Sequence, residues 1–313
     1  MISRLPAAAV LAALAIALAA CVASPASTPP SARPSGVPSA GSSAGEAPVL
    51  PLLVSSELRV GENRTLFTLL DSAGQKQVAG PSRTLAVGYR GPAGQVIPPV
   101  AQTFIWALQD VNGVYVGHTT FPAAGSWTAD ATTEAPGSPR VTLSFSFDVK
   151  QTAQVVSPGD PAPSVKTPTL ADVGGDVAKI SSDPAPLKRF YETSEADALA
   201  AKKPFVLIFA TPKFCKSATC GPTLDKVKPV AAAHPELTFI NVEPYQLTFA
   251  NGSLQPVLTN NDLTPVEATN AFRLLSEPYV FVVGADGKVS SSFELVFTPD
   301  EIEAAIKKVE AAG

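Results

Sequence analysis

The stretch "FVLIFATPKFCKSATCGPTLDK", residues 205–226, joins an apolar run to two cysteines, Cys215 and Cys220. Its first five residues (FVLIF) are apolar at every position, which is typical of a strand buried on both faces of a sheet. Residues 221–234 (GPTLDKVKPVAAAH) carry helix signals, with one proline near the first turn and a second as an expected kink. The stretch therefore predicts a strand, a cysteine loop and a helix, in that order.

The spacing of the two cysteines limits what the backbone between them can do. On a regular helix, residues three apart lie about 60° from each other, whereas residues five apart lie about 140° from each other. Cys215 and Cys220 therefore cannot meet from one regular helix, and residues 216–219 (KSAT) are expected to form a loop or a distorted turn. The helix is expected to begin just after Cys220, where the dipole and free N–H groups favour a thiolate. Lys213 and Lys216 add positive potential beside Cys215.

Residues 187–313 alternate between helix and strand patterns. "SEADALAAKK" has helical spacing with Ser194 as its N-cap, and "LTFINVE" reads as a second buried strand. "LTPVEATNAFRLL" predicts a short helix, and "EPYVFVVGADGKVSSSFEL" predicts two strands joined by a tight Asp286-Gly287 turn. "TPDEIEAAIKKVEAA" closes the chain as a helix capped by Thr298. The predicted order of elements is α-β-α-β-α-β-β-α.

This order, with a cysteine pair between the first buried strand and its helix, resembles the thioredoxin fold. Pro278, which opens the strand before the last hairpin, adds to the resemblance. It implies an α/β thioredoxin-like domain over residues 187–313, with a βαβ unit and a ββα unit around a central sheet. The chain departs from the family's usual W-C-x-x-C motif in its C-x4-C spacing, in having Phe214 as the preceding aromatic, and in lacking a carboxylate within FVLIF.

The resemblance assigns catalytic roles to the two cysteines but leaves two registers open. In one register Cys215 attacks and Cys220 resolves. In the other, "TCGPT" aligns with the family motif, so that Cys220 takes the attacking place and Thr223 the place of its partner. Cys215 would then resolve from upstream.

The resemblance also implies a substrate-binding surface beside the cysteines. Glu277-Pro278 corresponds to the family's cis-proline, whose preceding backbone pairs with an extended substrate. Glu277, Pro278 and Phe214 are thus the expected substrate-binding residues. No cofactor is implied, and the expected partners are protein thiols or disulfides.

The first residues of the chain predict its compartment. "MISRLPAAAVLAALAIALAAC" has one early positive charge and then an apolar run that ends in small residues, the pattern of a secretory signal. Its end, "LAAC", resembles the lipobox of bacterial lipoprotein precursors, which implies cleavage before Cys21 and acylation of that residue. Residues 1–20 are the expected signal peptide, and residues 21–47, rich in Ser, Pro, Ala and Gly, an expected disordered tether. We expect a protein anchored by lipid to the cell membrane on its extracytoplasmic side.

That location bears on the cysteine count. The chain has three cysteines, and acylation of Cys21 leaves Cys215 and Cys220 as a pair. In an exported protein such a pair can be oxidised and remain so.

Residues 48–150 read as an all-β domain. Short alternating apolar segments recur between turns rich in Gly, Pro, Asn and Asp, and "LSFSFDV" alternates with period two. Six or seven such strands predict an immunoglobulin-like sandwich, and "FPAAGSWTADA" resembles a hairpin of bacterial Ig-like domains. His118 is the domain's only histidine, so no copper or other metal site is expected. Residues 151–186, rich in Pro, Gly and Asp, are the expected linker, packing as an extended arm on the second domain.

Three functions remain open. The first is thiol–disulfide exchange through Cys215 and Cys220. The second is a non-enzymatic interaction module in which the same pair is a structural disulfide. The third, copper delivery by two thiolates, would need a distal histidine, and His234 lies on the wrong segment. The net charge of −4 and the absence of a basic run disfavour nucleic-acid binding.

Overall fold

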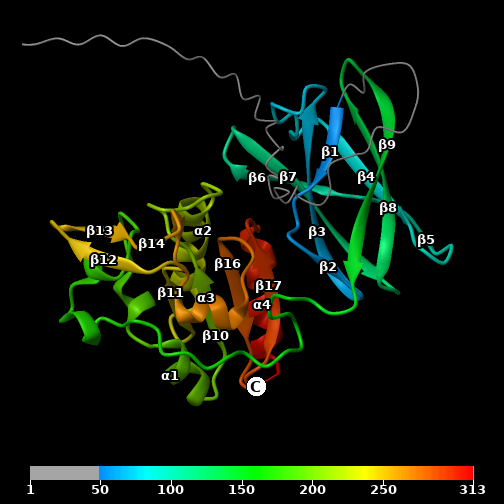
Figure 1. Ribbon diagram of the computed structural model, residues 1–313. Coiled ribbons are helices and arrows are strands. Elements are labelled where there is room, and N and C mark those ends of the chain that lie inside the picture. Colours follow the sequence, from blue (N-terminus) through cyan, green and yellow to red (C-terminus); the bar gives the residue numbers. More distant parts are fainter. Residues whose placement is uncertain (1–48, 313) are drawn as a thin grey trace, which may run out of the picture. The chain divides into compact units, whose positions relative to one another are not determined.

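The computed structural model describes residues 49–312; the expected signal peptide, Cys21 and the tether lie outside these residues. Residues 49–150 form two sheets (Figure 1). The first has the order β1-β3-β7-β6 and is antiparallel throughout. The second has the order β2-β9-β8-β4-β5, with β2 parallel to β9 and the other pairs antiparallel. The strands are β1 (Val49–Leu53), β2 (Leu58–Arg59), β3 (Gly61–Asp71), β4 (Thr84–Arg90), β5 (Val96–Ala101), β6 (Thr103–Leu108), β7 (Asn112–Phe121), β8 (Gly125–Ala135) and β9 (Ser138–Lys150).

Side chains from both sheets meet in one apolar core, so these strands form a sandwich. Phe67 and Tyr115 come from the first sheet and Trp127 and Phe147 from the second, and all four are buried. Residues 144–150 of β9 alternate between exposed and buried, because successive side chains of a strand point to opposite faces. The expectation of an all-β domain is confirmed.

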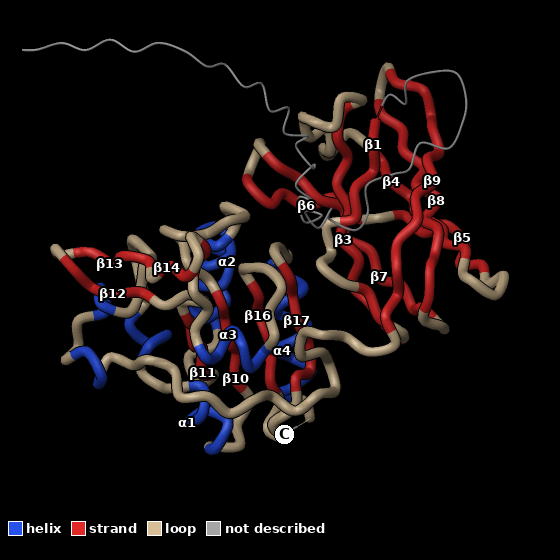
Figure 2. The backbone as a smooth tube through the Cα atoms, viewed as in Figure 1, coloured by secondary structure: helices blue, strands red, loops and turns tan. Residues whose placement is uncertain are grey.

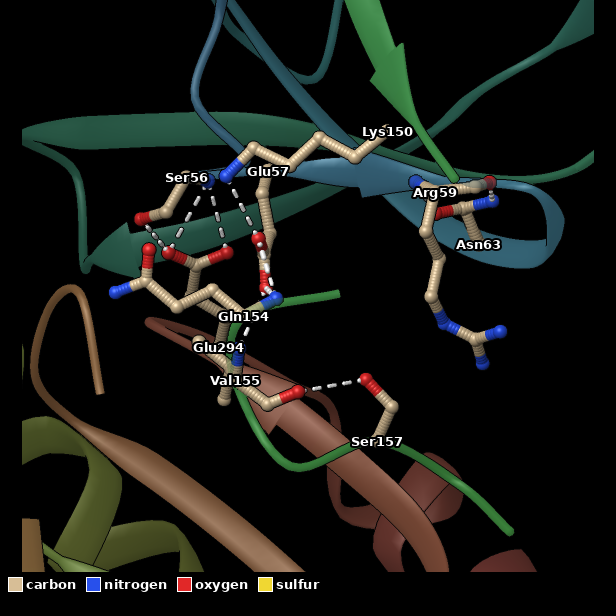
Figure 3. A network of polar contacts seen from close by, with 9 residues as sticks. All are labelled: Ser56, Glu57, Arg59, Asn63, Lys150, Gln154, Val155, Ser157 and Glu294. Atoms are coloured by element: carbon tan, nitrogen blue, oxygen red, sulfur yellow. Dashed lines mark hydrogen bonds and ion pairs between the residues drawn. The ribbon is translucent and has the colours of Figure 1, made fainter. Parts of the chain in front are cut away.

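Polar contacts fix the segment that follows the sandwich. The Glu57 carboxylate accepts the backbone N–H of Val155 at 2.8 Å and pairs with Lys150 at 3.1 Å (Figure 3). The same view shows the Glu294 carboxylate accepting the N–H of Ser56 at 3.1 Å. The Glu57 carboxylate also accepts the backbone N–H of Gln154 at 2.9 Å, so two consecutive backbone donors hold residues 154–155 against this side chain.

Residues 151–186, called the arm below, are mostly irregular and contain the short 3-10 helices η1 (Ala171–Val173) and η2 (Val177–Lys179) (Figure 2). The arm is bonded to elements that follow it in the sequence. Ala162 donates its N–H to the carbonyl of Gly287 at 2.9 Å, and Gly159 donates to that of Val289 at 2.8 Å. Its apolar side chains also enter the core of residues 187–312.

A separate four-stranded sheet lies in residues 187–312, with the order β11-β10-β16-β17. β10 runs parallel to β11 and antiparallel to β16, and β17 is antiparallel to β16. The Glu277–Pro278 bond, just before β16, is cis, as the resemblance implies. The main elements are η3 (Lys188–Tyr191), α1 (Glu195–Ala200), β10 (Phe205–Phe209), α2 (Cys220–Ala233), β11 (Thr238–Val242), α3 (Glu267–Phe272), β16 (Tyr279–Val283), β17 (Val289–Glu294) and α4 (Pro299–Glu310).

The central strand β10 is covered on both faces, which explains its unbroken apolar sequence. Val206 and Ile208 belong to a core that includes side chains of α2 and α4. Phe205, Leu207 and Phe209 belong to a second core that α1, α3 and the arm complete. Full burial of each such side chain contributes roughly 1.5–3 kcal/mol relative to exposure.

Local signals set the helix ends as predicted. Ser194 accepts the N–H of Asp197 at 3.2 Å, which caps α1. Thr298 and Glu301 form a reciprocal capping box at the start of α4. Gly287 has φ +75°, a conformation that glycine adopts without steric cost, in the turn before β17.

Two hairpins between β11 and α3 were not predicted from the sequence. They pair β12 (Leu247–Ala250) with β13 (Ser253–Pro256) and β14 (Leu258–Thr259) with β15 (Asp262–Leu263). Figure 1 shows β12 and β13 extending away from the four-stranded sheet. Within residues 49–312, no helix is long and apolar enough to cross a membrane.

Candidate functional site

A disulfide joins Cys215 and Cys220, whose Cα atoms are 6.0 Å apart. Cys215 lies in the loop after β10, and Cys220 is the first residue of α2, one position earlier than predicted. Residues 216–219 form the expected irregular loop, in which Ala218 has φ +61°. The loop lets two cysteines meet that a regular helix would hold apart.

The two sulfur atoms differ in their surroundings. The Cys220 side chain is fully buried and packs in the core with α2 and α4, whereas Cys215 is half-buried at the edge of that core. The backbone N–H of Cys220 donates to the Cys215 sulfur at 3.2 Å, and the Ser217 hydroxyl lies 3.3 Å from it. A thiolate at Cys215 would therefore keep an N–H donor at a helix N-terminus.

Glu277 touches the cysteine loop at two consecutive residues. Its Oε1 accepts the backbone N–H of Lys216 at 2.7 Å, and its carbonyl oxygen accepts the Ser217 hydroxyl at 2.8 Å. Its Oε2 accepts the Tyr245 hydroxyl at 2.5 Å. Burial, together with this bond, raises the pKa of Tyr245, so the phenol stays a donor. Sequence reasoning assigned Glu277 a backbone role only and did not foresee its carboxylate contacts.

The two lysines of the loop face the hairpins. Lys213 donates from Nζ to the carbonyl of Leu254 at 3.0 Å, and Lys216 Nζ lies 3.7 Å from the Asp262 carboxylate. The Lys216 ammonium also lies 5.8 Å from the centre of the Tyr245 ring. The positive charges expected beside Cys215 are thus partly engaged by the inserted hairpins.

A buried carboxylate that sequence analysis did not single out lies near the base of the loop. Glu243 follows β11, and its Oε1 accepts the N–H of Ser182 at 2.5 Å. The Ser182 hydroxyl in turn accepts the N–H of Lys213 at 3.2 Å. Burial raises the pKa of the Glu243 carboxyl. In the sequence, Glu243 is only a charged residue directly after an apolar strand. The tertiary structure brings it to the loop.

The remaining predicted residues are placed as follows. Pro278 is buried, and Phe214 is half-buried with the Lys213 ammonium 5.4 Å from the centre of its ring. Thr223 is buried in α2 and donates to the carbonyl of Leu295 at 3.3 Å. Phe214, Pro278 and Glu277 thus belong to the segments that flank the disulfide.

The two histidines lie on other elements. His118 is exposed on β7. His234 follows α2 and contacts the carboxylates of Glu303 at 2.9 Å and Glu310 at 3.3 Å. In residues 49–312, no group of three or more His, Cys, Asp or Glu side chains is arranged to hold a metal ion.

No protein-family model and no curated protein matches the chain. Among solved structures, one similar protein is a DUF4426 family protein from Pseudomonas aeruginosa. The similarity covers 30% of this chain and 68% of that chain, with 15% sequence identity and a TM-score of 0.23. At that score the similarity carries no argument about fold or function.

Proposed function

We propose that the chain is an exported, lipid-anchored thioredoxin-like protein that exchanges thiols and disulfides through Cys215 and Cys220. The mixed sheet β11-β10-β16-β17, with the cysteine loop between β10 and α2, supports a thioredoxin-like domain. The two-sheet sandwich supports an Ig-like domain, which we assign a stabilising role at the surface. Anchoring through Cys21 on the extracytoplasmic side is part of the same proposal.

The observation that carries this function is the asymmetry of the two sulfur atoms. Cys215 is the more accessible and receives an N–H donor, whereas Cys220 is fully buried. We therefore assign the attack to Cys215 and the resolving role to Cys220. A thiolate is the nucleophile in such exchange, and access decides which sulfur reacts.

The exchange is balanced in two steps. The Cys215 thiolate attacks one sulfur of a partner disulfide, forms a mixed disulfide and releases the other partner sulfur as a thiolate. Cys220, after losing its proton, then attacks the Cys215 sulfur and releases the second partner thiol. The protein ends as the Cys215–Cys220 disulfide, and the partner has gained two electrons. The reverse sequence oxidises a partner dithiol.

The alternative is a non-enzymatic interaction module in which the disulfide is structural. The burial of Cys220 in the same core as α2 and α4 favours this alternative, because a disulfide packed there also restrains the loop. The two functions differ in whether the reduced protein reacts with external disulfides.

Single-cysteine variants separate these functions. The reduced protein, C220S and C215S are each mixed with oxidised glutathione, and the adducts are measured by mass spectrometry. We expect C220S to accumulate a mixed disulfide at Cys215 and C215S to react much more slowly. The wild-type protein should release two glutathione thiols and regain its disulfide. Faster reaction of C215S would reverse the assignment of the attacking cysteine, and no adduct in either variant would support the structural alternative.

A further inference from the structure

The carboxylate of Glu277 connects the cysteine loop to a residue far from it in the sequence. It accepts the Lys216 N–H on one oxygen and the Tyr245 hydroxyl on the other. Glu277 is 5% exposed; its bond to Tyr245 is buried, and its bond to the Lys216 N–H is partly buried. Hydrogen bonds to a buried charged group contribute more than those between neutral groups.

The loop that Glu277 contacts is also the segment that must close when the disulfide forms. Cys215 and Cys220 are separated by four residues, two of which, Lys216 and Ser217, bond to Glu277. Once the disulfide is reduced, an unrestrained loop gains conformational freedom, and closing it again costs that entropy. A loop that stays bonded to Glu277 keeps the two thiols close together.

We infer that Glu277, braced by Tyr245, is a positioning residue that sets how readily the Cys215–Cys220 disulfide is reduced. It does so by restraining the loop of the dithiol form, which raises the effective concentration of one thiol at the other. The inference rests on the proposed function only in treating the pair as a reversible couple. It makes the carboxylate side chain, and not only the backbone of Glu277, part of the redox site.

The redox equilibrium with dithiothreitol tests this inference. The protein disulfide accepts two electrons and two protons from the dithiol, which becomes a cyclic disulfide. We expect E277A to favour the reduced protein about tenfold more than the wild type does, which is a rise in reduction potential of about 30 mV. Y245F should shift the equilibrium in the same direction by a smaller factor, since it removes only the hydrogen bond from Tyr245 to Glu277.

E277Q separates positioning from charge. Its amide oxygen can still accept the Lys216 N–H and its amide N–H₂ can donate to Tyr245, so the loop contacts survive while the charge is lost. We expect E277Q to stay within about twofold of the wild type in the same equilibrium. An E277Q shift as large as that of E277A would assign the effect to charge and overturn the positioning role.

A matched control removes a different buried carboxylate. Glu195 is fully buried and accepts the N–H of Val165, away from the cysteine loop. E195A should leave the equilibrium constant unchanged even though it lowers stability, and an equal shift in both variants would overturn the inference. The two proposals fail in different ways. If E277A has the same dithiothreitol equilibrium as the wild type while the wild-type protein still reduces oxidised glutathione, the inference fails and the proposed function stands. If the wild-type protein does not reduce oxidised glutathione but E277A still shifts the dithiothreitol equilibrium, the proposed function fails and the inference stands. A pair that stays oxidised in all variants at every dithiothreitol ratio overturns both.

Discussion

Glu195 gives the most quantitative prediction that the structure supports. Its side chain is fully buried at the start of α1, where Oε2 accepts the N–H of Val165 at 2.6 Å. Its other carboxylate oxygen has no hydrogen-bond partner within residues 49–312. Burial raises the pKa of this carboxyl from 4.5 to about 7. The substitution to make is Glu195→Gln, which keeps an acceptor for Val165 and removes the titration.

The sign of the effect follows from proton linkage. Between pH 4.5 and about 7 the folded protein keeps a proton on Glu195 that the unfolded chain has lost. The folded state therefore binds more protons over that range, and its stability falls as pH rises. A difference of about 2.5 pKa units corresponds to a loss of about 3 kcal/mol between pH 4.5 and 7.5. E195Q should lack this loss, so its stability relative to the wild type should rise with pH by about that amount.

The assay uses urea unfolding from pH 4.5 to 8, followed by two signals. All the α-helices of the described residues lie in residues 187–312, so far-UV circular dichroism at 222 nm reports that part. Both tryptophans, Trp106 and Trp127, lie in the sandwich, so their fluorescence reports residues 49–150 and should be unaffected. Glu192→Gln, which removes the same charge from an exposed position, is the control. Parallel pH profiles for E195Q and the wild type in the helical transition would contradict the raised pKa of Glu195.

Three further predictions concern the same helical transition in urea. The double variant C215S/C220S should lose about 2 kcal/mol, the loop-closure entropy of a disulfide that spans five positions, and an unchanged midpoint would contradict that origin. Thr298→Ala should cost about 1 kcal/mol through loss of the capping box, with T298S as a control that retains most of it. Gly287→Ala should cost about 1 kcal/mol or more because φ is +75°, whereas Gly221→Ala, in a helix with open space around the added methyl, should be neutral or stabilising.

The elements of residues 187–312 that are marked by periodicity were predictable from the sequence. The apolar run of β10 predicts a strand covered on both faces, and Thr298 with Glu301 predicts the start of α4. The cysteine spacing predicts an irregular loop, because its reason is the geometry of the helix itself. In each case a few neighbouring residues carry the whole signal.

The polar surroundings of the disulfide could not be predicted in the same way. Glu277 and Tyr245 are separated from the loop by tens of residues, and only the pairing of β10 with β16 and β11 brings them to it. The hairpins in residues 247–263 also escaped prediction, since their two- to four-residue strands are too short for a periodic pattern. Which sulfur is more exposed depends on how α2 packs, a property of the tertiary structure.

The arm has a practical consequence for dividing this protein into fragments. A fragment cut at residue 187, where the sequence pattern changes, would lose Ala162 and Gly159, which bond to the turn before β17 and to β17 itself. It would also strip Val155 and Val165 from the apolar core under β10. Exposed strand edges and bare apolar faces promote aggregation. A recombinant fragment carrying the Cys215–Cys220 disulfide should therefore begin before residue 154. Poor expression or solubility caused by the missing arm would then not be mistaken for an effect of the disulfide itself.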